Sequence, residues 1–368
     1  MHAETGSRDP NSRRRVTISD VAEHLALTKG TVSRALNGYA DISESTRLRV
    51  RKAADQLGYR PLSHAQAIRT GRVRAVGLVL QVNEHDGHRP FVADFLAGVS
   101  EAASREDWTL TVATAESEED TLRLLEKISD ERKADGFILP RTRVTDPRVE
   151  FLRAQSTPFV LYGRTGDDTG CAWYDIKGED AMADAVTRLA ALGHRRIGFV
   201  PGADGYTYAG LRRDGYCAGL AQAGLPFDGR LIAPSAVDRR GGADAAERLL
   251  DLAEPPSAIV YSVDRAAFGA YDVARRRGLT IGRDLSLIAY DGVPESSFVD
   301  PPLSTYVVDI RKAGERLADL LIRRARGADA ADLRELDQAR FLGRDSHGPA
   351  PKSVLRPHTQ PVPGSVTS

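Results

Sequence analysis

Short apolar runs alternate with amphipathic helical stretches from Val73 onward, and this alternation restricts the fold more than any other feature of the chain. The apolar runs have the length and β-branched content of buried strands. They cover residues 73–80, 108–115, 136–140, 158–163, 196–200, 257–261 and 285–291. Helical patterns lie between them, for example at 91–106, 177–192, 210–224, 241–253 and 264–277. Apolar strands separated by helices form parallel sheets covered on both faces, so the pattern predicts an α/β fold.

This region, residues 73–346, is too long for one open sheet, so we expect two doubly wound lobes. In such sheets, ligands bind beyond the carboxyl ends of the strands. Two lobes would present those ends to each other across a cleft, which is the expected place for a small-molecule ligand. The residues that follow, 347–368, are rich in proline and are predicted to form a disordered tail.

Residues 16–61 have the pattern of three short helices with a thin apolar core. Thr17 through Asp20 fits a capping box, and Thr28 fits the N-cap of a second helix. Ser43 fits the N-cap of a third helix, which stops at Gly58. Two helices joined by a tight turn are typical of a helix-turn-helix, whose second helix lies in the major groove of DNA. We therefore predict an all-α DNA-binding head, preceded by a disordered arm at residues 1–15.

The zero net charge conceals an asymmetry between the two parts of the chain. Residues 1–74 contain 14 Lys/Arg and 7 Asp/Glu, whereas the remainder contains 37 Lys/Arg and 44 Asp/Glu. A small basic part on a larger acidic body is expected where only the small part approaches phosphates.

The second predicted helix opens with Lys29, Gly30 and Thr31, and Arg34 follows one turn later. Lys and Arg donate hydrogen bonds to guanine O6 and N7, and Thr contacts a thymine methyl or a phosphate. Glycine reads no base but permits close approach. Short polar groups near the helix ends complete the predicted DNA-binding set by holding phosphates and register; they are Thr17, Thr28, Ser33, Asn37 and Thr46. A solvated surface lysine remains the alternative interpretation of Lys29, because a helix-turn-helix pattern alone is a weak signal.

Four short segments of the head carry a more specific signal: T-I-S-D-V-A, T-V-S-R-A-L-N-G, I-S-E-S-T-R and L-G-Y-R-P. Their order and spacing closely resemble the DNA-binding head of the LacI/GalR (lactose/galactose repressor) family. The resemblance continues more weakly through the body, in RTGRVRAVGLVL, ADGFILP, LGHRRIGFV, GLRRDGYCAGL, DLSLIAYDG and PPLSTYVVDIRKAGERLADLLI. It implies a periplasmic-binding-protein-like body and a homodimer, with a tetramer left open. The paired heads would read double-stranded operator DNA under the control of a sugar-type effector.

In that family, the segment matching Ser63–Arg69 becomes a hinge helix on operator binding, and an apolar residue wedges into the minor groove. Such wedges unstack a base step and kink the duplex. Ile68 stands where the family usually has leucine. From the residues alone, the hinge segment 62–72 is either a linker or a two-turn helix that forms only with a partner.

The resemblance also implies a set of effector-binding residues in the body. Phe91 matches an aromatic residue that packs against the ligand ring, Arg212 an effector arginine, and Asp291 a carboxylate that accepts hydroxyl hydrogen bonds. An arginine opposite a carboxylate suits a polyhydroxy ligand. Arg164 lies just past a predicted strand and is expected to project into the cleft, and Asp264 completes the predicted set. The alternative interpretations are that Phe91 is a core residue, that Arg212 and Asp291 form an interlobe salt bridge, and that Arg164 is a solvated loop charge.

The chain departs from the family pattern at two effector positions. Val263 precedes Asp264 where the family often has asparagine, and an aromatic position near Ala236 is unfilled. Tyr206, Tyr208 or Trp173 are candidates to compensate for the missing aromatic group. The effector therefore cannot be inherited from the family, although the G-R-T loop at 163–165 is similar to that of repressors of glucoside or disaccharide genes.

Other functional classes find little support in the sequence. The longest apolar runs are too short to cross a bilayer, and no apolar segment of a secretory signal follows the first arginines. The two cysteines, Cys171 and Cys217, have no framework or metal spacing, which favours a reducing cytoplasm. The polar loop from Glu84 to His88 has two histidines but no third fixed ligand, so neither a metal nor a cofactor is expected.

Two other classes of protein remain to be weighed. A solute-binding protein of a transporter uses the same two-lobed body, but it requires export and leaves the basic head unexplained. A sugar-modifying enzyme requires a catalytic pair, for which Asp264 with Asp291 is the sole carboxylate candidate. The sequence therefore predicts a sequence-specific, cytoplasmic transcriptional regulator of carbohydrate-use genes, most simply a repressor, that associates with the nucleoid when bound to DNA.

Overall fold

The computed structural model describes residues 16–59, 72–81 and 92–352, and the backbone alone of residues 89–91. The chain divides into two compact units, Met1–Val73 and Arg74–Ser368, which are described separately below. The predicted arm, the hinge segment with Ile68 and the Glu84–His88 loop lie outside the described residues.

The first unit is a bundle of three helices, α1 (Ile18–His24), α2 (Lys29–Leu36) and α3 (Glu44–Leu57). Asp20 accepts a hydrogen bond from the backbone N–H of Thr17, as a capping box requires, and it also accepts one from the Thr17 hydroxyl. Thr28 caps α2 and Ser43 caps α3, each by accepting a backbone N–H through its hydroxyl oxygen. Gly58 ends α3 with φ at +71°, a left-handed conformation that glycine adopts without steric cost. The predicted helix starts are thus confirmed.

Val21, Val32, Ala35 and Val50 form the fully buried centre of this bundle. They come from all three helices, so each helix needs the other two to bury its apolar face.

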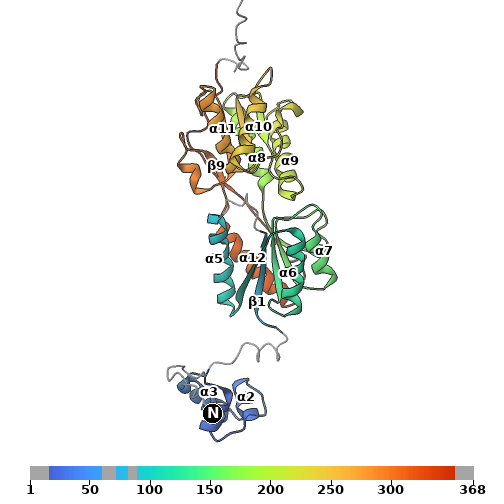
Figure 1. The fold of residues 1–368 in the computed structure, drawn as a ribbon, viewed down its shortest axis with the longest axis vertical. Helices are drawn as coiled ribbons and strands as arrows, with labels where there is room; N and C mark the ends of the chain where they lie inside the picture. Colours follow the sequence, from blue (N-terminus) through green and yellow to red (C-terminus); the bar gives the residue numbers. More distant parts are fainter. Residues whose placement is uncertain (1–15, 60–71, 82–88, 353–368) are drawn as a thin grey trace, which may run out of the picture. The chain divides into compact units, whose positions relative to one another are not determined.

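The second unit contains two sheets with helices on both faces, which confirms the predicted α/β fold class (Figure 1). The first sheet has the order β10-β5-β4-β3-β1-β2 and is parallel throughout. Its strands are β1 (Ala75–Gln81), β2 (Thr109–Ala115), β3 (Gly136–Pro140), β4 (Phe159–Tyr162), β5 (Ala172–Ile176) and β10 (Arg334–Asp337). We call this sheet and its helices lobe 1.

The second sheet has the order β11-β9-β8-β7-β6, in which only β11 is antiparallel to its neighbour. Its strands are β6 (Ile197–Val200), β7 (Ala258–Tyr261), β8 (Ser286–Asp291), β9 (Ser304–Val307) and β11 (Arg340–Leu342). This sheet and its helices form lobe 2. The seven predicted strands are all present, whereas β5, β9, β10 and β11 were not predicted.

Each sheet of the body is covered by two pairs of helices. In lobe 1, α5 (Arg89–Arg105) and α12 (Ile310–Ala325) pack on one face, and α6 (Glu118–Asp130) and α7 (Pro147–Ala154) on the other. In lobe 2, α8 (Gly178–Ala191) and α9 (Thr207–Gln222) pack opposite α10 (Arg239–Leu250) and α11 (Asp264–Arg276).

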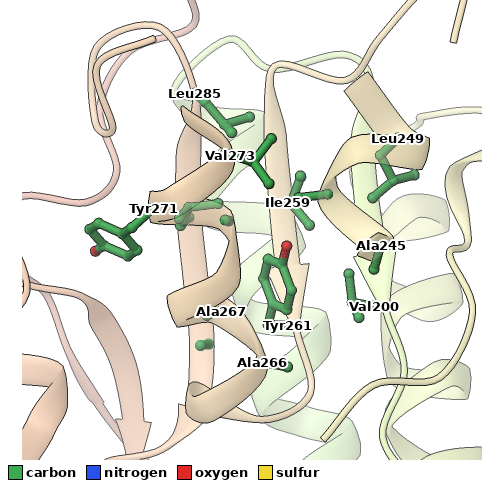
Figure 2. Packing of buried hydrophobic residues seen from close by; sticks show 14 of the residues in the cluster. Val200, Ala245, Leu249, Ile259, Tyr261, Ala266, Ala267, Tyr271, Val273 and Leu285 are labelled. Atoms are coloured by element: carbon green, nitrogen blue, oxygen red, sulfur yellow. The ribbon is translucent and has the colours of Figure 1, made fainter. Parts of the chain in front are cut away.

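Figure 2 shows the core of lobe 2 beneath α10 and α11, where Ile259 and Tyr261 of β7 face Ala245, Leu249 and Ala266. The two helices approach closely because glycines line their contact. A Cβ on Gly242 would lie 1.8 Å from the carbonyl oxygen of Ala266.

The chain passes between the lobes three times. It leaves lobe 1 at Lys177, returns at residues 308–309 before α12, and leaves again at residues 338–339. The crossings are held together, because the Lys177 N–H donates to the carbonyl oxygen of Asp337 at 2.9 Å. Lobe 1 is therefore completed by segments that follow most of lobe 2 in the sequence.

The body extends beyond the predicted boundary at residue 346. Buried His194 contacts Ser257 through Nδ1 at 2.7 Å and the Gly348 carbonyl oxygen through Nε2 at 3.0 Å. His347 contacts Ser304 at 2.8 Å. The tail predicted to begin at 347 was thus placed several residues too early, because these contacts come from lobe 2 residues distant in sequence. Within the described residues, no helix has the length and apolar character to span a membrane.

Candidate DNA-reading and effector sites

The start of α2 presents the predicted DNA-reading residues at the surface of the head. Lys29 and Gly30 are exposed in the first turn, and Thr31 is half-buried beside them. The Thr31 N–H donates to the Thr28 hydroxyl oxygen at 3.1 Å, and the two hydroxyls are 2.9 Å apart. This cap fixes the first turn, so Lys29 is attached to a rigid point of the head.

Arg34 has an intramolecular partner that the sequence did not reveal. Its guanidinium donates to the Asp41 carboxylate at 2.8 Å, and both side chains are about half exposed. Arg34 must leave this exposed ion pair to contact a base, which costs little because such pairs contribute only about 0–1 kcal/mol. Asn37 donates to the Ser33 carbonyl oxygen at 2.7 Å.

Two further predicted phosphate-holding groups lie near helix starts. Thr17 is exposed at the start of α1, and the Thr46 hydroxyl lies 2.8 Å from that of Ser43 at the start of α3. The described head residues of the predicted set are all exposed or half-buried, which leaves them accessible to DNA. Their roles in DNA contact stay predictions.

In the body, Arg212 of α9 is held by its surroundings from three sides. Its guanidinium carbon lies 3.8 Å from the ring centre of Tyr290 and 4.8 Å from that of Tyr208, so the group contacts two aromatic rings. One Nη donates to the Ser262 carbonyl oxygen at 2.5 Å. The buried Nε–H has no hydrogen-bond partner among the described residues. Arg212 therefore has one fixed donor left to satisfy.

Asp291, the last residue of β8, is half-buried near the charge of Arg212. Burial raises the pKa of Asp291 to about 6, although the charges of Arg212 and Arg141 act in the opposite direction. Its φ of +124° is a conformation that side-chain-bearing residues rarely adopt. A strained, desolvated carboxylate beside an arginine is typical of a ligand site.

Asp264 performs a structural task at this site. Its carboxylate accepts hydrogen bonds from the N–H groups of Gly292 at 2.8 Å and Val293 at 2.9 Å, and from the Thr305 hydroxyl at 2.6 Å. Burial and the nearby Asp291 charge raise its pKa. These bonds hold the loop after β8, and with it the backbone of Asp291. They occupy both carboxylate oxygens, which argues against Asp264 as half of a catalytic pair.

Arg164 is likewise engaged by partners within the protein. Its Nε donates to Asp175 at 2.6 Å, and one Nη donates to the two oxygens of Glu179 at 2.8 and 3.0 Å. These ion pairs differ from the solvated loop charge that was the alternative for Arg164, and a ligand contact of Arg164 stays a prediction. The side chain of Phe91 lies outside the described residues, so its contact with a ligand stays a prediction.

Of the three aromatic residues considered as compensating groups, Tyr208 lies beside Arg212, and Tyr206 stacks on Tyr208 at 6.0 Å. Trp173 packs in the core of lobe 1, and Ala236 is buried in lobe 2. The sequence analysis missed Tyr290 and Ser262 as neighbours of Arg212. The only available signal was the position of both at the carboxyl ends of predicted strands.

Main-chain hydrogen bonds join the two lobes beside this site. The Val144 N–H of lobe 1 donates to the Gly205 carbonyl oxygen at 3.2 Å, and the Thr207 N–H of lobe 2 donates to the Thr142 carbonyl oxygen at 3.1 Å. We call these two bonds the clasp. The Arg143 guanidinium lies 5.7 Å from the ring centre of Tyr206 in the same place.

Comparison with known proteins agrees with both halves of this arrangement. Residues 17–62 match the family model of bacterial regulatory proteins of the lacI family. Residues 74–341 match that of periplasmic binding proteins and the sugar-binding domain of the LacI family. The chain is 36% identical over 359 residues to the HTH-type transcriptional regulator AglR of Rhizobium meliloti (strain 1021), covering 95% of this chain and 99% of that protein. It is 30% identical to the regulator RafR of Escherichia coli, covering 86% of this chain and 94% of RafR.

Solved structures show the same architecture. The complex of the transcriptional regulator CelR with cellobiose is similar with a TM-score of 0.70 and 27% identity, over 90% of this chain and all of that one. The lac repressor dimer bound to operator has a TM-score of 0.75 over 91% of this chain, and at 23% identity it supports the fold alone. The helix-turn-helix head, the two-lobed body and these matches show that the chain belongs to the LacI family of transcriptional regulators, which bind DNA and are not enzymes.

Proposed function

We propose that the protein is a homodimeric repressor of carbohydrate-use genes, released from its operator when an uncharged saccharide binds beside Arg212 and Asp291. It would act in the cytoplasm, on the nucleoid when bound to DNA. The pairing of dimers into tetramers is a further state that the proposal permits.

The guanidinium of Arg212 near the carboxyl of Asp291 carries this proposal. Together they offer hydrogen-bond donors and an acceptor, which matches neighbouring hydroxyl groups of a sugar. Their charges are opposite, so an uncharged ligand leaves the buried charge balanced, whereas an anion adds an uncompensated one. The complex of the regulator CelR with the disaccharide cellobiose agrees with an effector of this kind.

A thermal-shift screen tests the effector site. The purified chain is heated with maltose, sucrose, melibiose, cellobiose or raffinose, because a ligand at 100 times its Kd stabilises the folded state by about 2.7 kcal/mol. We expect at least one of these sugars to raise the Tm, and Arg212→Ala to abolish the increase. Arg213→Ala is the matched control, since Arg213 is the exposed neighbour on α9.

The same sugar should weaken binding of the chain to fragments of its own promoter region, measured by fluorescence anisotropy at moderate salt. An Arg212→Ala protein that folds and keeps the full sugar-induced shift would overturn the assignment of the site. A wild-type chain that prefers no promoter fragment over random duplex would overturn the operator-binding role.

A further inference from the structure

Arg164 joins two parts of the body that belong to different lobes. It follows β4 in lobe 1, and its partner Asp175 lies on β5 of the same lobe. Its other partner, Glu179, lies in the first turn of α8, which packs in lobe 2. The chain passes from lobe 1 to lobe 2 at Lys177, which lies between Asp175 and Glu179. The Arg164 guanidinium therefore connects residues on the two sides of this passage.

The first turn of α8 is packed tightly against the helix that bears Arg212. A Cβ on Gly178 would lie 2.9 Å from the Nε of Arg212. A Cβ on Gly215 of α9 would lie 2.1 Å from the carbonyl oxygen of Glu179. With no space between the backbones, a displacement of this turn must displace Arg212 as well.

We propose that Arg164 is a positioning residue of the effector site, which ties lobe 1 to the first turn of α8 and thereby favours the closed, clasped arrangement of the lobes around Arg212. The inference rests on the proposed function of that site. It assigns to Arg164 an indirect effect on effector affinity, through the lobes rather than through contact with the sugar.

The charges around Arg164 explain why arginine is needed there. Asp175 and Glu179 are two carboxylates whose side chains are only 14% and 24% exposed, so each is poorly screened by water. The planar guanidinium satisfies both at once, whereas a lysine ammonium lacks the forked geometry to do so. Without Arg164 the carboxylates repel each other across the crossing, which favours separation of the lobes.

The clasp provides a direct measure of lobe separation that requires no ligand. The N–H groups of Val144 and Thr207 donate across the lobes, so both exchange with solvent when the lobes part. The amides of β3 and β7 each lie within one lobe, so their exchange reports on unfolding of that lobe instead of lobe separation.

The experiment compares hydrogen exchange of the full-length wild-type chain, Arg164→Gln, Glu179→Gln and the double variant. We expect each single variant to accelerate exchange at Val144 and Thr207 by about tenfold or more, as for the loss of a partly buried charged hydrogen bond. Exchange in β3 and β7 should not change. The double variant should exchange no faster than Arg164→Gln alone, because both substitutions break one connection.

Asp180→Asn is the matched control. It removes one negative charge from the same turn of α8, but among the described residues Asp180 forms an ion pair with Lys177 alone, at 3.5 Å. Exchange at the clasp should therefore stay at the wild-type rate. Unchanged clasp exchange in Arg164→Gln and Glu179→Gln would overturn the proposal, and so would effects that add in the double variant or equal that of Asp180→Asn.

A second measurement links the positioning role to the effector. For a sugar that raises the Tm of the wild type, Arg164→Gln should weaken binding severalfold, and Arg164→Lys should restore little of it. If no sugar of the panel binds the wild type, the proposed effector class fails, yet the exchange experiment still decides whether Arg164 holds the lobes together.

Discussion

Lys29 illustrates how much one position can reveal before a structure is known. The sequence placed it in the first turn of the second helix, and the structure shows it exposed there, on a turn fixed by the Thr28 cap. Its alternative reading, a solvated lysine, predicts the same exposure. Only a DNA-binding measurement can distinguish these two interpretations of Lys29.

We expect Lys29→Ala to change the base preference of the protein, because a side chain that reads a base edge discriminates by about 1–3 kcal/mol per base pair. Thr17→Ala should instead weaken binding to all sequences alike, since a phosphate contact carries no base information. Binding to a library of operator variants measures both. An equal loss across every variant with Lys29→Ala would contradict the readout role.

Asp291 predicts a pH dependence of effector binding. Its pKa of about 6 means that the carboxyl becomes protonated as the pH falls below about 6, and a protonated carboxyl accepts hydroxyl hydrogen bonds less well. We expect the affinity for a bound sugar to decline below that pH, measured by calorimetric titration. The Arg213→Ala control should show the same decline as the wild type, and loss of the decline in this variant would contradict the assignment to Asp291.

The stability of the ligand-free protein should instead increase as the pH falls below about 6. The pKa of Asp291 in the folded state is raised above its value of 3.8 in the unfolded chain, so its contribution to stability falls as the pH rises from about 4 to 6 and is constant above. Asp291→Asn should therefore gain ~1 kcal/mol relative to wild type between pH 5 and pH 8 in denaturant unfolding. A constant difference across that range would rule out the raised pKa.

At the scale of elements, strands with apolar sequences were predictable and polar ones were not. The runs that became β3, β7 and β8 have mostly buried, apolar residues. In contrast, β10 has the sequence RELD and lies at the edge of its sheet, where one side needs no apolar cover. Periodicity cannot distinguish such a strand from a loop, because its formation depends on pairing with β5.

The close packing of α8 against α9 predicts opposite effects for two glycines of α9. Gly215→Ala should lower the free energy of unfolding by about 1–3 kcal/mol, because its Cβ would overlap the backbone of Glu179. Gly210→Ala should raise it by up to about 1 kcal/mol, because its Cβ would meet nothing within 4 Å and alanine favours the helix. Urea unfolding of both variants tests the pair, and equal effects would contradict it.

At the scale of the whole molecule, the sequence predicted the two lobes but not which side chains pair with each other around the site. Arg212 and Asp291 were both found through the resemblance to a family. That Asp264 is bonded to Thr305, and Arg164 to Glu179, could not be predicted, because these contacts depend on how distant elements pack. From the sequence alone, Asp264 and Arg164 have the chemistry of ligand-binding groups.

The distribution of basic residues predicts a contribution from the N-terminal arm to DNA binding. Residues 16–59 contain six Lys/Arg and five Asp/Glu, so most of the positive excess of the first 74 residues lies elsewhere, including four arginines before residue 16. A chain that begins at residue 16 should bind DNA more weakly, with the slope of log K against log salt reduced by up to about 3–4. Its preference for operator over random duplex should persist. An unchanged slope would show that the arm contacts no phosphate.

The threefold passage of the chain between lobes has a consequence for biogenesis. A ribosome that has delivered residues 74–176 has made five of the six strands of lobe 1, but neither the edge strand β10 nor the covering helix α12. The apolar face that α12 shields stays open until nearly the whole polypeptide has emerged. Both halves of the sensor must therefore mature together late in synthesis, and a message cut short before residue 309 yields no complete half.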